Sequence, residues 1–62
     1  MEIVNAKTAQ AWLRAWNGRP TGAYLAIAIE GLRVSAGLTP DHCPAAKAGY
    51  LAAIRILEDA RP

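Results

Sequence analysis

The sequence predicts a small all-α domain with three helices, at about residues 6–16, 22–36 and 44–60, and three observations lead to this prediction. Apolar residues in each segment recur every three or four positions, which places them on one face of a helix. Glycine and proline gather in the two stretches between the segments, as they do in turns. No segment alternates apolar and polar residues in the manner of a β-strand. A chain of 62 residues accommodates one domain, which we expect to span residues 1–62.

The first predicted helix begins after Asn5, which is a suitable N-cap residue. Its apolar stripe has four members: Ala9, Trp12, Leu13 and Trp16. Residues 17–21 follow, and their Asn-Gly pair and proline are typical of a turn. Because this connection is short, we expect the first and second helices to be antiparallel neighbours.

The second predicted helix is the most apolar part of the chain. Thr21 can cap its first turn, and Gly37 suits the left-handed position that often follows a helix. Its main stripe has five members: Leu25, Ala28, Ile29, Leu32 and Ala36. A second apolar row lies beside this stripe and consists of Tyr24, Ile27, Gly31 and Val34.

Only two residues of this helix are charged, Glu30 and Arg33, and their spacing predicts an ion pair between them. The helix is therefore apolar over most of its circumference, so either its own chain or a neighbouring subunit must cover it. A membrane span is the less favoured interpretation, because the apolar run over residues 23–29 is much shorter than the ~20 residues that a bilayer requires.

The third predicted helix follows a second break in the chain. Thr39 and Pro40 resemble an N-cap and a first helical residue, but Pro44 would remove a hydrogen bond from a helix that began there. We therefore expect a single turn over residues 40–43, followed by the helix. The apolar stripe of this helix consists of Ala46, Tyr50, Ala53, Ile54 and Leu57.

Two glycines lie inside predicted helices, Gly31 and Gly49, and each costs ~1 kcal/mol relative to alanine. Such a cost indicates a close helix crossing, either within the chain or between chains.

Only 17 residues are Ile, Val, Leu, Trp or Tyr, which is a small core for a chain of this length. Small domains compensate with disulfides, metals or oligomerisation. The single cysteine excludes an internal disulfide, so we expect a helical homo-oligomer. Its predicted interface comprises Tyr24, Ile27, Gly31, Val34, Gly49 and Tyr50.

His42 and Cys43 are the only adjacent pair of classically reactive side chains. A zinc site requires three or four protein ligands, and one His and one Cys are too few unless subunits share the metal. A thiol nucleophile needs an oriented base, and Asp41 is the only acid at hand to orient His42. The carboxylates elsewhere show no paired arrangement. We therefore predict no enzymatic activity, no metal and no cofactor, and we favour a capping turn with a half-buried cysteine.

The strongest candidate binding cluster consists of Trp12, Arg14, Trp16 and Arg19, because Trp and Arg are enriched at binding hot spots. A core role for the two tryptophans is the more favoured alternative. Lys7, Arg14 and Arg19 lie in a stretch without acidic residues, which is more typical of an ordinary solvated face than of a ligand site.

The formal charge of +2 is too small to indicate a nucleic-acid-binding face. A helix-turn-helix is disfavoured as well, since the third helix has few polar side chains to contact bases. The chain starts Met-Glu without an apolar signal region, and its single cysteine agrees with a reducing compartment, so we expect a cytoplasmic protein.

These observations favour a non-enzymatic interaction protein that self-associates and binds a larger protein partner. By analogy of size, it resembles the small accessory or inhibitory proteins of bacteria and their phages. One alternative is an oligomer that binds a small anionic ligand such as a nucleotide, with phosphate contacted by basic side chains from the set Lys7, Arg14, Arg19, Arg55 and Arg61. Another alternative is weak nucleic-acid binding through the basic N-terminal helix.

Overall fold

The computed structural model of the protein describes residues 2–16 and 22–61. Three α-helices make up the fold: α1 (Ala6–Ala15), α2 (Gly22–Leu38) and α3 (Pro44–Asp59). The described residues contain no β-strand. The predicted all-α fold with three helices is therefore confirmed, and the predicted ends of the first and third helices are correct to within one residue.

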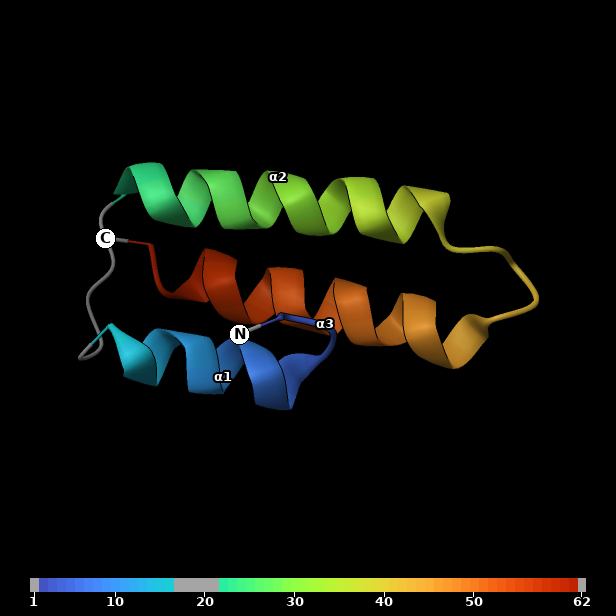
Figure 1. Cartoon of the computed structure of the whole chain (residues 1–62), viewed down its shortest axis with the longest axis horizontal. Coiled ribbons are helices and arrows are strands. Elements are labelled where there is room, and N and C mark those ends of the chain that lie inside the picture. Colours follow the sequence, from blue (N-terminus) through green and yellow to red (C-terminus); the bar gives the residue numbers. More distant parts are fainter. Residues whose placement is uncertain (1, 17–21, 62) are drawn as a thin grey trace.

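The third helix in the sequence is the central helix of the molecule. Figure 1 shows α3 between α1 and α2, and both of these helices pack against it. The described backbones of α1 and α2 do not pack along each other, so the predicted neighbours approach at one end, where the ring centroid of Trp16 lies 4.9 Å from that of Tyr24. A short connection brings the end of one helix near the start of the next, but it does not force their axes together. α1 packs against α3 instead, and Ala9 of α1 and Ala53 of α3 are both fully buried in the shared core.

The predicted N-cap of α1 is confirmed and is part of a reciprocal capping box. Asn5 Oδ1 accepts a hydrogen bond from the Thr8 backbone N–H at 2.9 Å, and Thr8 Oγ1 accepts one from the Asn5 backbone N–H at 3.0 Å. Thr8 Oγ1 also accepts the Val4 backbone N–H at 2.9 Å. These bonds hold the chain before α1 in a fixed direction. Thr21, the predicted cap of α2, lies outside the described residues.

The C-terminus of α2 differs from the prediction. The helix continues through Gly37 and ends at Leu38, so Gly37 does not take the left-handed position after the helix. Thr39 closes the last turn: its backbone N–H donates to the Ser35 carbonyl oxygen at 3.1 Å, and its hydroxyl donates to the same oxygen at 2.7 Å. These two bonds satisfy a carbonyl that would otherwise lack a partner.

The break between α2 and α3 contains the expected single turn. The Cys43 backbone N–H donates to the Pro40 carbonyl oxygen at 3.0 Å, and α3 then begins at Pro44, where the missing N–H of proline costs nothing. Thr39 thus belongs to the end of α2 and is not an N-cap for a helix that begins at Pro40.

The core confirms most of the predicted apolar stripes. The buried residues come from all three helices and are Ala9, Leu25, Ile29, Leu32, Ala36, Ala53, Ile54 and Leu57. Ala28 and Tyr50 pack half-buried against them, whereas Ala46, the first member of the predicted stripe of α3, is exposed. No polar or charged residue of the described chain is buried.

Two predicted contacts are replaced by longer-range ones. The Arg33 guanidinium pairs with the Glu58 carboxylate of α3 at 3.1 Å, in place of the predicted pair with Glu30. Gly49 approaches the chain before α1: a Cβ at this position would lie 2.6 Å from the Val4 carbonyl oxygen. A Cβ at Gly31 would meet nothing within 4 Å. Within the chain, the two glycines therefore do not form a common helix crossing.

The three helices differ in length, and this difference shapes the molecule. They contain 10, 17 and 16 residues, which corresponds to roughly 15, 26 and 24 Å. α1 runs beside the C-terminal part of α3, so the opposite half of the α2–α3 hairpin extends beyond it (Figure 1). In the described part of the chain, none of the helices combines the length and the apolar character that are needed to cross a membrane.

Candidate interaction surface

The outer side of α2 carries a row of exposed apolar side chains. Ile27 is 69% exposed, Val34 53% and Leu38 78%. Together with Gly31, which is also exposed, they follow one another at intervals of four, three and four residues. We call these four residues the outer row. They lie on the side of α2 that faces away from its buried residues, because Leu25, Ile29 and Leu32 fill the opposite side.

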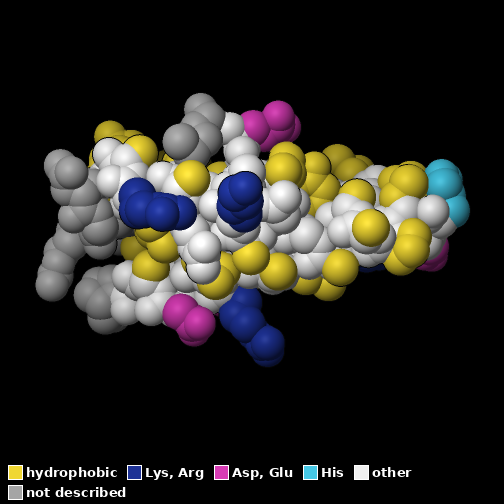
Figure 2. All heavy atoms as spheres, turned by 90° about the horizontal axis from the view of Figure 1, so that it is seen from below, with side chains coloured by type: hydrophobic (Ala, Val, Ile, Leu, Met, Phe, Trp, Pro, Cys, Tyr) yellow, Lys and Arg dark blue, Asp and Glu magenta, His cyan; other side chains and the backbone are white. Residues whose placement is uncertain are grey.

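The outer row has few charged neighbours on its own helix. Glu30 is the only acidic residue of α2, and Arg33 is paired with Glu58 on the side toward α3. Figure 2 shows further apolar side chains at the surface of the α2–α3 hairpin, toward the end that carries the histidine. An apolar surface with little charge is typical of a face that a protein partner covers.

Tyr24, one turn before the outer row, belongs to an aromatic ladder that connects α1 to α2. The ring centroids of Trp12 and Trp16 lie 5.7 Å apart, and those of Trp16 and Tyr24 lie 4.9 Å apart. Trp12 packs half-buried against the core, whereas Trp16 is 36% exposed. The two tryptophans therefore have different environments, and the ladder holds Tyr24 against the chain's own first helix.

The predicted oligomer interface divides into two groups in the structure. Tyr24, Ile27, Gly31 and Val34 are all exposed on α2, and the ring of Tyr24 also packs against Trp16. Gly49 instead faces the Val4 carbonyl, and Tyr50 packs against the core, so both are engaged with their own chain. Leu38 was missed because the predicted helix stopped at residue 36. The signal was present, since Leu38 continues the spacing of Gly31 and Val34.

The predicted binding cluster around Trp12 and Trp16 is only partly described. Arg14 is exposed at the end of α1, and Arg19 lies outside the described residues. Lys7 is exposed two turns before Arg14 on the same helix. Figure 2 shows the side of the molecule on which α1 lies, and its basic side chains are separated by apolar and neutral surface. The described part of this side does not form a continuous basic stripe.

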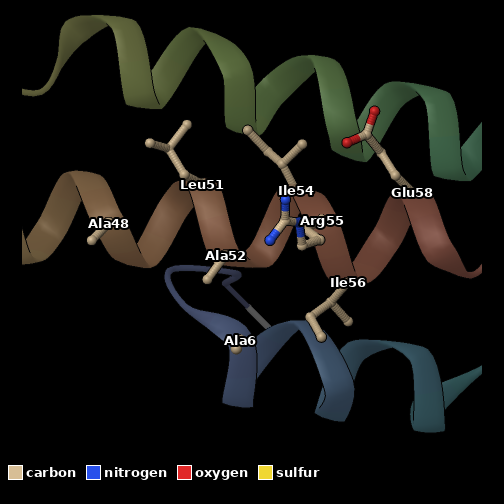
Figure 3. A pocket seen from close by; sticks show the side chains of 8 residues that line it. All are labelled: Ala6, Ala48, Leu51, Ala52, Ile54, Arg55, Ile56 and Glu58. Atoms are coloured by element: carbon tan, nitrogen blue, oxygen red, sulfur yellow. The ribbon is translucent and has the colours of Figure 1, made fainter.

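An open hollow of about 660 Å³ lies along α3 on the side shown in Figure 3. It is lined by Ala6, Ala48, Leu51, Ala52, Ile54, Arg55, Ile56 and Glu58. Arg55 lies over its middle, while Leu51 and Ile54 point toward α2. Neither Lys7 nor Arg14 lines this hollow. An anionic ligand there would meet one arginine together with the carboxylate of Glu58.

The turn before α3 contains Asp41, His42 and Cys43. The Asp41 carboxylate pairs with the Lys47 ammonium group at 3.3 Å, so the one acid expected to orient His42 is engaged elsewhere. Cys43 is half-buried at the N-cap position of α3, and its side chain makes no capping hydrogen bond. Among the described residues, no group of three His, Cys, Asp or Glu side chains could hold a metal ion.

Comparisons of the chain with protein-family models, with curated proteins and with solved structures found no match.

Proposed function

We propose that this protein is a non-enzymatic helical interaction protein that works by association through the outer row of α2. One observation carries the proposal: Ile27, Val34 and Leu38 are each more than half exposed on one face of a well-packed helix. Full burial of a large apolar side chain contributes about 1.5–3 kcal/mol, so leaving three of them in water forgoes a large part of the stability of so small a chain. A partner that covers the row would recover part of this free energy.

The second part of the proposal is that association brings the protein to a larger protein partner, as an accessory or inhibitory subunit in the cytoplasm. The exposed edge of Trp16 together with Arg14 offers a second contact of the type enriched at binding hot spots. A nucleotide or nucleic-acid ligand has less support, because Lys7 and Arg14 lie on α1, apart from the hollow that contains Arg55.

Replacement of Ile27 by Asp tests the proposed surface. We expect Ile27→Asp to weaken association by tenfold or more, which corresponds to ~1.4 kcal/mol or more, because the substitution places a charge on a surface that must lose its water. The matched control is Ala26→Asp, an exposed position on the same helix that lies beside the row and not in it.

Association of both variants would be measured by sedimentation velocity for self-association and by co-purification from the native cell for a larger partner. Circular dichroism would verify that both variants keep their helices. The proposal fails if Ile27→Asp and Ala26→Asp associate as strongly as the unchanged protein.

A further inference from the structure

We propose that the outer row is covered by the outer row of a second copy of this chain, packed antiparallel, so that Val34 of each copy lies against Gly31 of the other. This inference builds on the proposed function, because it names the partner that covers the same surface.

The spacing of the outer row matches the pattern by which two helices pack together. Residues four, three and four positions apart form the narrow apolar seam of a coiled coil. This pattern reads the same in both directions along the helix. An antiparallel copy therefore aligns Ile27 with the partner's Leu38 and Gly31 with the partner's Val34, and the same two pairs recur on the other side of the twofold axis.

The shape of the row favours the antiparallel arrangement over the parallel one. A Cβ at Gly31 would meet nothing within 4 Å, so the surface above Gly31 is an open notch in the chain by itself. In the antiparallel dimer, Val34 of each copy lies over the Gly31 notch of the other copy. Parallel packing would instead place glycine against glycine and valine against valine, which leaves a gap at one layer and crowds the next.

The charges beside the row agree with this arrangement. Glu30 flanks the row, and in the antiparallel pairing it faces the partner's Gly37, so that no two carboxylates oppose each other. Arg33 is held by Glu58 on another side of the helix. The dipoles of two antiparallel helices also attract at both ends. The pairing therefore brings no unpaired like charges together.

The outer face of α2 is accessible to a second copy. α2 forms one edge of the molecule in Figure 1, so a helix can approach it without meeting α1 or α3. With Ile27 69% and Leu38 78% exposed, the contact would bury on the order of 1,000 Å² in total over both copies, at the lower limit for a specific interface. We therefore expect a dissociation constant of roughly micromolar.

Cysteine cross-linking tests the pairing directly. All variants carry Cys43→Ser, which removes the single native thiol. We expect the double variant Ile27→Cys/Leu38→Cys to form covalent dimers under mild oxidation, because the pairing brings each new thiol next to one on the partner. The two positions within one chain are roughly 16 Å apart along the helix, which is too far for an internal disulfide.

The matched controls are the two single variants, Ile27→Cys and Leu38→Cys, in the same background. The antiparallel pairing keeps like positions roughly 16 Å apart, so neither single variant should cross-link efficiently. Efficient dimers of the Leu38→Cys variant would show a parallel pair and overturn the inference. Absence of cross-linking in the double variant would overturn it as well.

A second measurement avoids the introduced thiols. In sedimentation equilibrium we expect the unchanged protein to dimerise and Gly31→Leu to weaken the dimer at least tenfold, because the new side chain fills the notch that Val34 needs. Circular dichroism shows whether the helix survives this substitution. A folded protein that is monomeric at ~100 μM, well above the expected dissociation constant, would refute the proposed dimer. The proposed function would still be decided separately, by whether Ile27→Asp and Ala26→Asp differ in binding a larger partner.

Discussion

Gly31 and Gly49 are both glycines inside helices, yet their surroundings differ completely. Gly49 lies where the chain before α1 crosses α3, and a Cβ there would collide with the Val4 carbonyl oxygen at 2.6 Å. The capping box of Asn5 and Thr8 holds that segment in place, so the carbonyl cannot move aside freely. Gly31 faces open space. The same residue type therefore serves packing within the chain at one position and leaves a notch at the other.

The two glycines give opposite stability predictions. Gly49→Ala is expected to lower the free energy of unfolding by about 1–3 kcal/mol, because the strain of the added methyl group exceeds the gain in helix propensity. Gly31→Ala is expected to raise it by about 0.5–1 kcal/mol, since only the propensity gain applies there. Urea denaturation at protein concentrations below the dissociation constant measures both. Equal effects of the two substitutions would contradict this account.

At the scale of the helix, α2 shows how much the sequence alone can predict. Its buried stripe was predictable because helical periodicity is a local property of the sequence. The C-terminus was not, because glycine adopts both the helical and the left-handed conformation, and the choice is made here by hydrogen bonds from Thr39. The early end assigned to the helix then removed Leu38 from the predicted interface.

Other contacts depended on packing between elements, which the sequence pattern does not contain. The sequence spacing predicted an ion pair between Arg33 and Glu30. The packing of α2 against α3 instead brings Arg33 to Glu58. Gly49 was predicted to face a helix, but its neighbour is the segment before α1, which has no periodicity that could reveal its path. Local patterns therefore predicted the helices and their faces, but not which helix each face would meet.

Two leucines of α3 test the assignment of its faces. Leu57 is fully buried, so Leu57→Ala is expected to lower the free energy of unfolding by about 2–5 kcal/mol. Leu51 is 54% exposed and lines the hollow. Leu51→Ala should therefore change the free energy of unfolding by less than about 0.5–1 kcal/mol. Thermal or urea unfolding followed by circular dichroism measures both. A cost for Leu51→Ala as large as that for Leu57→Ala would mean that the faces of α3 are misassigned.

At the scale of the whole molecule, the packing is uneven along its length. α1 covers only part of α3. One half of the molecule therefore contains all three helices, and the other half contains only α2 and α3. Residues 33–38 and 44–48 make up most of the two-helix half, and Ala36 is the only buried residue that they contribute. The buried leucines and isoleucines lie in the other half. The stability of the fold should therefore be concentrated at the end where α1 lies.

Hydrogen exchange can map this difference. At concentrations where the chain is monomeric, we expect backbone amides of residues 34–38 and 48 to exchange faster than those of residues 29–32 and 53–57, because local opening needs less apolar surface to be exposed. Nuclear magnetic resonance resolves the rates residue by residue. Uniform protection along α2 and α3 would show that the molecule opens as one unit and would contradict the prediction.

The central position of α3 also has a consequence for the time at which the protein acquires its structure. During synthesis α1 and α2 leave the ribosome first, without the packing partner from which most of the stability of a helix comes. Their buried stripes face a helix that has not yet been made. We therefore expect the N-terminal part of the chain to stay unfolded until α3 has emerged, because both of its helices pack against α3.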